Sequence, residues 1–209
     1  MAISGSLSKF TVPIAGQQNQ GLLMPKLKYR FRAMFINFGV AGSETVELTK
    51  QVIDIKRPTV NFNPITIDVY NSKVYLQGKP EWSETTITLR DDVNGNVARL
   101  VGEQIQKQFD FMEQSSAASG IDYKFAMQFE VLDGGNGDGA NGPGILETWE
   151  LAGCQLSQVD YGDMNYSSND PATIALTVRF DNAIQAPVGT GVGTAIGRTV
   201  GSVITGGGV

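Results

Sequence analysis

Alternation of apolar and polar residues marks a first strand over residues 26–38. Leu27 and Tyr29 fall on one face, with charged residues between them, and this is the pattern of a strand with one buried face. From Met34 to Phe38 the second face turns apolar as well. We therefore predict a strand that is half exposed at its start and covered on both faces at its end.

The segment 44–57 has an apolar face that changes sides. Val46 and Leu48 lie on one face of an extended chain, whereas Ile53 and Ile55 lie on the other. A long strand of this kind must bend or belong to two sheets, as strands do in barrels and orthogonal sandwiches.

One amphipathic helix is predicted among further strands. Asn96–Ser115 places apolar residues such as Leu100 and Ile105 at helical spacing, with Asp92 among the candidate caps before it. The sequence therefore predicts a mainly β, α+β fold, an antiparallel β-sandwich or barrel with one flanking α-helix. The other predicted strands, rich in β-branched or aromatic residues, are Ile65–Tyr70, Ser83–Arg90, Tyr123–Leu132, Ile145–Val159 and Ala172–Asp181.

Two segments are too rich in glycine to hold regular structure alone. Asp133–Gly144 reads DGGNGDGANGPG between two predicted strands, so we expect a hairpin tip there. Residues 183–209 are dominated by Gly, Ala, Val and Thr, which disfavours an isolated helix. The expected organisation is an N-terminal arm over 1–25, a β domain over 26–182 with its helix near 96–115, and a Gly-rich C-terminal tail over 183–209.

The 209-residue chain contains no histidine. Histidine is the commonest general base and the commonest metal ligand, so its absence argues against most hydrolytic triads and against zinc chemistry. Charged residues make up 18% of the chain, which is low and fits a surface that neighbouring subunits cover. We expect a structural protein, not an enzyme, with no catalytic residues and no cofactor.

Two acidic patterns approach known chemical sites without completing them. Asp92 to Glu103 places oxygen ligands at several positions of a calcium loop, but Val97 stands where that loop requires glycine. Acid pairs such as Asp160 and Asp163 would suit a carboxylate-dependent glycosidase, yet acids in turns are usually capping groups. Helix caps and turns are the preferred interpretation, and no metal site is expected.

Charge and cysteine content bound the partners and the compartment. The 16 basic and 21 acidic residues give a net charge of −5, which argues against stable binding of a nucleic-acid backbone. Cys154 is the single cysteine, so we expect folding in a reducing cytosol without an internal disulfide. Residues 1–21 show no targeting pattern, and no run approaches about 20 apolar residues, so no membrane anchor is expected.

Characteristic runs of residues accompany this order of elements: Lys73–Gly78 (KVYLQG), Trp82–Asp92 (WSETTITLRDD), Gly153–Gln155 (GCQ), Val159–Tyr161 (VDY), Ser167–Asp170 (SSND) and Ile174–Val178 (IALTV). In order and pattern, the chain resembles the tail tube proteins of contractile-tailed bacteriophages over Lys26–Asn182. The Gly-rich loop 133–144 and the tail after Asn182 depart from that pattern.

The resemblance implies a structural virion protein that closes with copies of itself into a hexameric ring, whose strands merge into one inter-subunit β-barrel. Such rings stack into the inner tube of a contractile tail and form a conduit for genome ejection. The implied partners are the tail sheath, baseplate and tail terminator proteins, with the tape measure protein and DNA transiently in the lumen. The subunit is then made in the host cytoplasm and located in the virion tail.

Two alternatives to a phage tail stay open from the sequence. A tube protein of a contractile injection or secretion system would have the same architecture and conduct effectors instead of DNA. A monomeric β-barrel that binds a ligand in its interior would also explain the strand pattern.

Acidic residues on predicted strands are candidates for the wall of the lumen. Every second residue of a strand shares a face, and a polar face in a closed tube meets the water of the channel. A negative wall would repel phosphate over about a Debye length, roughly 8 Å at physiological salt. The lumen-facing candidates are Glu47, Asp54, Asp68, Glu130 and Glu150.

Overall fold

The computed structural model describes residues 25–40, 45–135, 143–187 and 192, without the side chains of Glu47 and Pro187. The chain divides into two units, Met1–Arg30 and Phe31–Val209. In the first unit, the Arg30 N–H donates to the Leu27 carbonyl at 3.2 Å and forms a turn. The strand predicted from residue 26 therefore begins only at Phe31.

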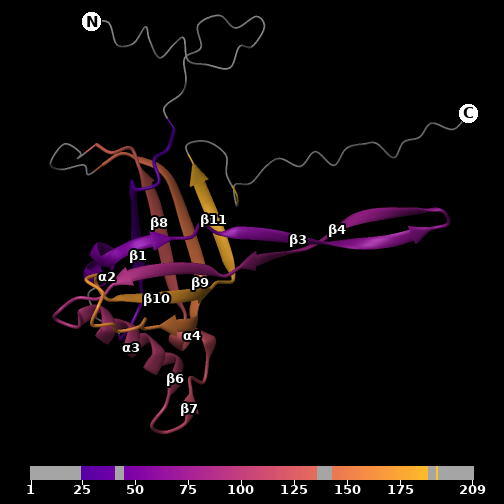
Figure 1. Ribbon diagram of the computed structural model, residues 1–209. Helices are drawn as coiled ribbons and strands as arrows, with labels where there is room; N and C mark the ends of the chain where they lie inside the picture. Colours follow the sequence, from indigo (N-terminus) through magenta and orange to yellow (C-terminus); the bar gives the residue numbers. More distant parts are fainter. Residues whose placement is uncertain (1–24, 41–44, 136–142, 188–191, 193–209) are drawn as a thin grey trace, which may run out of the picture. The chain divides into compact units, whose positions relative to one another are not determined.

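Antiparallel strands of the second unit form two sheets that share one strand (Figure 1). Sheet A contains, in spatial order, β1 (Phe31–Ile36), β8 (Phe125–Leu132), β9 (Ile145–Asp160) and β11 (Asn182–Pro187). Sheet B contains β9, β10 (Thr173–Arg179), β5 (Thr85–Arg90) and β2 (Val52–Ile55). The mainly β, antiparallel fold predicted from the sequence is confirmed.

The shared strand β9 changes sheets at Gly153. This residue has a φ of +68°, a left-handed conformation that favours glycine. The register with β8 shifts at the same place, between the pairs Met127–Leu151 and Phe125–Cys154. The sequence predicted a strand that bends or serves two sheets over 44–57, whereas the strand that serves both sheets is β9.

The segment predicted as one long strand contains a helix in its described part. Residues Val46–Gln51 form α2, and β2 follows directly. Leu48 and Val52 stand four residues apart, a spacing that places side chains on one face of a helix as well as of a strand. Leu48 is completely buried. Because both patterns fit the same residues, the strand prediction was wrong over α2.

The longest helix of the described residues, α3 (Asn96–Gln108), buries Val97, Leu100 and Val101 in the core, as predicted. The Asp92 carboxylate accepts the N–H of Val97 at 3.0 Å. The N-cap position is occupied by Gly95, which has no side chain to accept a hydrogen bond. Asp92, one of the predicted caps, lies three residues before it and accepts one of the free N–H groups of the first turn instead.

The helix ends at Gln108, earlier than the predicted Ser115. The Asp110 carboxylate accepts the N–H groups of Met112 and Glu113 at 2.9 and 3.2 Å and turns the chain. Met112, placed on the inner face by the helical pattern, is exposed in this turn. The turn separates the short strands β6 (Phe109–Asp110) and β7 (Ser115–Ser116), and α4 (Gly120–Tyr123) then leads into β8.

Two long strands, β3 (Thr59–Val69) and β4 (Ser72–Ser83), form a hairpin that projects from the sheets (Figure 1). Only Ile65–Tyr70 was predicted as a strand in this region. The strands join through Tyr70, which has a φ of +40°. All residues from Asn61 to Gln77 are exposed.

Strand pairing at the end of the β domain continues past Asn182. β11 pairs with β9 as far as Pro187, and Ala183 is buried in the core. Residues 1–24, 136–142 and all of 193–209 lie outside the described part of the chain. No described helix is long and apolar enough to cross a membrane.

Candidate assembly surfaces

Sheet A ends in two strands that each pair on one side only within the described chain. β1 pairs with β8, and β11 pairs with β9. Because each neighbour along the sheet is antiparallel, β1 and β11 run in opposite directions. The β11 edge of one copy therefore has the polarity to add, antiparallel, to the β1 edge of another.

The two edges differ in which of their backbone N–H and C=O groups are already hydrogen-bonded within the chain. On β11, the Gln185 N–H donates to the Val192 carbonyl at 2.7 Å, the Ala183 N–H donates to Asn182 Oδ1 at 3.0 Å, and Pro187 has no N–H. On β1, the Phe35 carbonyl accepts the Thr45 hydroxyl at 2.8 Å. An edge proline and edge groups that are covered by the protein's own chain are common means of limiting unwanted strand addition.

One face of sheet A packs on the hydrophobic core, and we call the other the open face. Strand alternation assigns its members, and of these only Glu130 is buried. Glu130 and Glu150 lie on the adjacent strands β8 and β9. The open face consists of Arg32, Met34, Ile36, Ala126, Gln128, Glu130, Leu132, Thr148, Glu150, Ala152, Asn182, Ile184 and Ala186.

Arg32 and Glu130 are directly opposite each other on β1 and β8. Arg32 donates to Glu130 Oε2 from Nε at 2.9 Å and from a terminal nitrogen at 2.5 Å. Gln128 Nε2 donates to the other carboxylate oxygen at 3.2 Å. Both oxygens of Glu130 therefore have partners, and its side chain is only 4% exposed.

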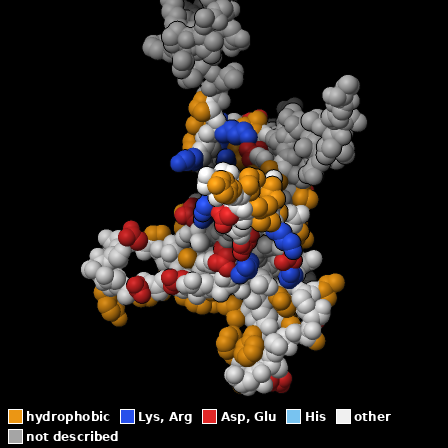
Figure 2. Space-filling model, turned by 90° about the vertical axis from the view of Figure 1, so that its right-hand side faces the viewer, with side chains coloured by type: hydrophobic (Ala, Val, Ile, Leu, Met, Phe, Trp, Pro, Cys, Tyr) orange, Lys and Arg blue, Asp and Glu red, His pale blue; other side chains and the backbone are white. Residues whose placement is uncertain are grey.

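The outer half of the hairpin has one continuous apolar face. Its members alternate with polar residues along both strands, and each is between 43% and 55% exposed. Figure 2, which looks from the side to which the hairpin projects, shows hydrophobic side chains exposed there. We call this surface the apolar hairpin face: Ile65, Ile67, Val69, Val74 and Leu76.

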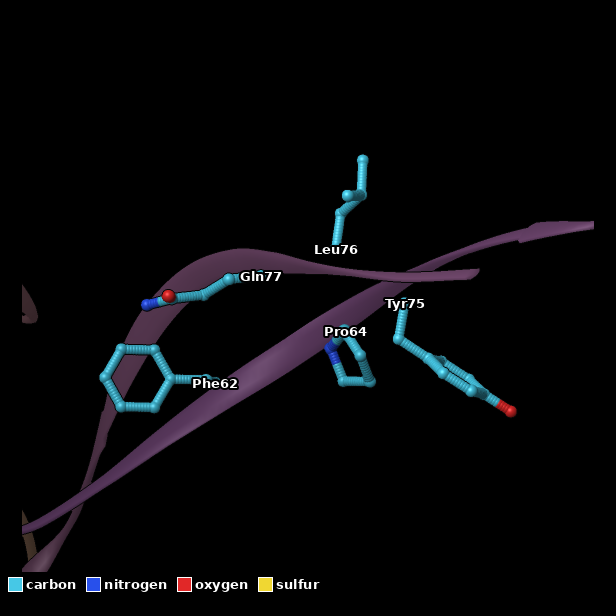
Figure 3. Close-up of a pocket in the computed structure, with 5 residues that line it drawn as sticks. All are labelled: Phe62, Pro64, Tyr75, Leu76 and Gln77. Carbon is cyan, nitrogen blue, oxygen red and sulfur yellow. The ribbon is translucent and has the colours of Figure 1, made fainter. Parts of the chain in front are cut away.

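The opposite face of the hairpin is mixed in character. Phe62, Pro64, Tyr75 and Gln77 surround a shallow depression, and Leu76 points to the other side (Figure 3). Further out, Lys73 and Asp68 approach within 3.6 Å. Of the two faces of the hairpin, only the apolar hairpin face therefore presents an uninterrupted hydrophobic strip.

The five acidic candidates for a lumen wall do not share one surface. Glu47 lies in α2, so the prediction that it lies on a strand was wrong. Asp54 is exposed on β2 of sheet B, and Asp68 is exposed on β3 of the hairpin. Only Glu130 and Glu150 come together, on the open face of sheet A.

Comparisons with known proteins rest on structure alone. No protein-family model matches the chain, and no significant sequence match is found among curated proteins. The anti-feeding prophage cap, described as a tube terminating cap, shares 12% identity at a TM-score of 0.58, covering 83% of this chain and 99% of that chain.

Two further solved structures also have a fold similar to that of this chain. A chain of the anti-feeding prophage baseplate is 12% identical at a TM-score of 0.56, covering 81% of this chain and 100% of its own. A chain of the PVC sheath-tube complex, an extracellular contractile injection system, is 15% identical at a TM-score of 0.51, covering 78% and 93%. The chain therefore shares its fold with chains of the anti-feeding prophage and of an extracellular contractile injection system, which agrees with its resemblance to contractile tail tube proteins.

Proposed function

We propose that the protein is a structural subunit of a tube, whose copies join through the β11 and β1 edges into a closed ring. The observation that carries the proposal is the pair of one-sided edge strands of opposite direction in sheet A. A contact between two different surfaces of one chain generates a ring when its rotation closes. Closure of a sheet into a barrel also removes its exposed edges.

The distribution of bulk on the two faces of sheet A supports the open face as the lining of such a ring. The core face carries α3 and sheet B, which pack into one hydrophobic cluster with β1, β8 and β9. This bulk has room only on the outside of a barrel. The open face of sheet A, with Glu130 and Glu150, then faces the channel.

The hairpin provides a second contact between copies. An isolated two-stranded hairpin is marginally stable in water, and a continuous exposed apolar strip is typical of an interaction surface. The apolar hairpin face would be covered by an adjacent copy in the assembled tube. Edge pairing and hairpin docking together would build both the ring and its stacking.

More specifically, we propose that the protein forms the hexameric tail tube of a contractile-tailed phage. The tube would lie inside a sheath, end at baseplate and terminator proteins, hold the tape measure protein, and conduct DNA into the host. A second candidate is the tube of a contractile injection system that conducts effectors, and it is supported by the similar chain from an extracellular contractile injection system. Both candidates are structural and need no catalytic residue.

Both candidates require that the protein forms a tube, and electron microscopy of the purified full-length chain tests this. We expect hollow tubes built from rings, together with a mass by analytical ultracentrifugation that increases with concentration. A monodisperse monomer at every concentration, combined with a bound small ligand, would favour the ligand-binding barrel instead. Six-fold symmetry in class averages would support the hexamer, and any other symmetry would contradict it.

A further inference from the structure

The open face of sheet A contains one cationic side chain, Arg32, among its described strand residues. Arginine binds phosphate groups with two parallel hydrogen bonds and is over-represented wherever phosphate is recognised. An uncovered arginine repeated around a ring and along a tube would therefore make an adhesive wall for a phosphate-rich polymer. Whether Arg32 is already paired within the chain therefore decides whether the channel of the proposed tube binds such a polymer.

In the structure, Arg32 is already bound by a carboxylate. Two of its nitrogens donate to the same oxygen of Glu130, at 2.9 and 2.5 Å. Gln128 holds the second oxygen of Glu130 at 3.2 Å and so fixes the carboxylate in this orientation. The guanidinium thus has its strongest partner within the chain, although 38% of the Arg32 side chain remains exposed.

The remaining charge on the face has the opposite sign. Arg32 and Glu130 cancel, and Glu150, exposed beside Gln128 in the register, is left. All other members of the open face are uncharged. Each subunit then contributes one net negative charge to this face, which repels phosphate within about a Debye length, roughly 8 Å at physiological salt.

We propose that Glu130 masks Arg32 so that the wall of the channel does not hold nucleic acid or another polymer of phosphates while it passes. The inference rests on the proposed function, which places the open face toward the channel. Stability alone is a poor reason for such a pair, since a buried ion pair is often no better than well-packed apolar residues. Masking explains instead why a buried carboxylate lies against an arginine on a face whose other members are exposed or half-buried.

Glu130→Gln tests the masking, because glutamine keeps the size and one acceptor oxygen but removes the charge that holds Arg32. Full-length wild type, Glu130→Gln and the Arg32→Gln/Glu130→Gln double variant are assembled with a fluorescent single-stranded oligonucleotide. The tubes are treated with nuclease to remove DNA from the outside, sedimented and measured. We expect Glu130→Gln tubes to retain at least about tenfold more oligonucleotide than wild type at about 50 mM salt, with retention falling steeply at higher salt.

The double variant separates masking from structural damage. It lacks the arginine as well, so we expect its retention to return to the wild-type level. Equal retention by all three proteins would overturn the masking. Retention by the double variant equal to that of Glu130→Gln would overturn it too, because Arg32 would then not be the group that binds.

The double variant Ala152→Arg/Glu150→Gln serves where Glu130→Gln fails to fold. Ala152 is exposed on the open face, and its cross-strand partner Asn182 carries no charge. Glu150→Gln removes the carboxylate two residues away on the same face of β9, so the added arginine is not masked. We expect tubes of this double variant to retain oligonucleotide. Tubes without retention would show that an unmasked arginine on this face holds no phosphate polymer, and the inference would be lost.

Binding by the soluble subunit distinguishes failure of masking from failure of the proposed function. Fluorescence anisotropy is used to compare wild type and Glu130→Gln as subunits, and each new phosphate contact should steepen the slope of log K against log salt by about 0.7. A steeper slope without tubes would contradict the tube but support masking. Tubes with an unchanged slope and no retention would support the tube and contradict masking.

Discussion

Gly78 lies against the Asn63 carbonyl where the register of the hairpin shifts, and a Cβ at Gly78 would be 2.0 Å from that oxygen. No side chain fits at this distance, so glycine is required by a close backbone approach. The shift is a β-bulge, which bends a strand and increases its twist. It separates the base of the hairpin from the outer half that carries the apolar hairpin face.

Gly78→Ala should therefore change the direction of the hairpin more than the stability of the domain. We expect tube yield, measured by sedimentation, to fall by about tenfold, which corresponds to about 1.4 kcal/mol of lost association free energy. The melting temperature should change little, because Gly78 lies outside the hydrophobic core cluster. Gly102→Ala is the control: apart from its chain neighbours and the backbone of its own helix, no atom lies within 4 Å of the new Cβ, and the change should stabilise α3 by about 0.5–1 kcal/mol. Normal tubes from Gly78→Ala would contradict the role of the bulge.

The two faces of the hairpin should respond differently to a charge. Ile67→Asp places a carboxylate in the centre of the apolar hairpin face, whereas Thr66→Asp places it on the opposite face of the same strand. We expect the first to lower tube yield by at least about tenfold, since an unpaired charge in an interface is costly, and the second to have a small effect. Circular dichroism should be unchanged in both. Equal yields would show that the apolar hairpin face is not an interface.

A buried glutamine connects α3 to two backbone segments. Gln104 is completely buried, its Oε1 accepts the Gly39 N–H at 2.9 Å, and its Nε2 donates to the Tyr123 carbonyl at 2.7 Å. Gln104→Leu leaves both backbone groups unpaired, and we expect a loss of about 2–5 kcal/mol in the free energy of unfolding. Gln158→Leu, at an exposed position on β9, should change it by less than about 0.5 kcal/mol. Urea unfolding measures both, and similar losses would contradict the role of Gln104.

Strands with one buried face were the predictable part of this fold. β5, β8, β9 and β10 each alternate between core and surface, and α3 shows a clear helical period, so all five were found from the sequence. The hairpin was found only in part, because both its faces are exposed and no core contact enforces its alternation. Its signal was present nonetheless, in apolar residues at 65, 67 and 69 followed by 74 and 76.

The arrangement of charges was the least predictable part. Arg32 and Glu130 are 98 residues apart in the chain, and only the pairing of β1 with β8 brings them together. The acidic residues were selected for lying on predicted strands, but which sheet a strand joins is set by long-range pairing. For that reason Asp54 and Asp68 were grouped with Glu130 and Glu150, although only the last two share a face.

The single cysteine should be unreactive in the folded protein. Burial raises the pKa of the Cys154 thiol from 9.0 to about 12, so below pH 9 the folded state has about a thousandfold less thiolate than the unfolded chain. We expect very slow labelling by a thiol reagent at pH 8 and full labelling in denaturant. Since the raised pKa favours the protonated folded state, its contribution to stability is present below pH 9 and is lost as the pH rises toward about 12. Rapid labelling of the native protein would show that β9 opens near Cys154.

Truncation distinguishes the last strand from the residues beyond it. A chain that ends at Pro187 keeps β11, with Ala183 in the core and the Gln185 side chain donating to the buried Glu147 carboxylate at 2.7 Å. We expect its melting temperature to stay within a few degrees of the full chain. A chain that ends at Asn182 loses this strand and leaves the edge of β9 unpaired. We expect its melting temperature to fall, by about 2–4 °C for each kcal/mol of unfolding free energy that is lost.

The same pair of truncations also tests the edge of sheet A. Without residues 188–209, the Gln185 N–H loses the Val192 carbonyl to which it donates and becomes free to pair with the β1 edge of another copy. Tubes of the chain that ends at Pro187 should then form at lower concentration than those of the full chain, as followed by light scattering. A chain ending at Asn182 should form no tubes, because one of the two edges is missing. If this shorter chain assembled normally, the ring would have to close through other strands.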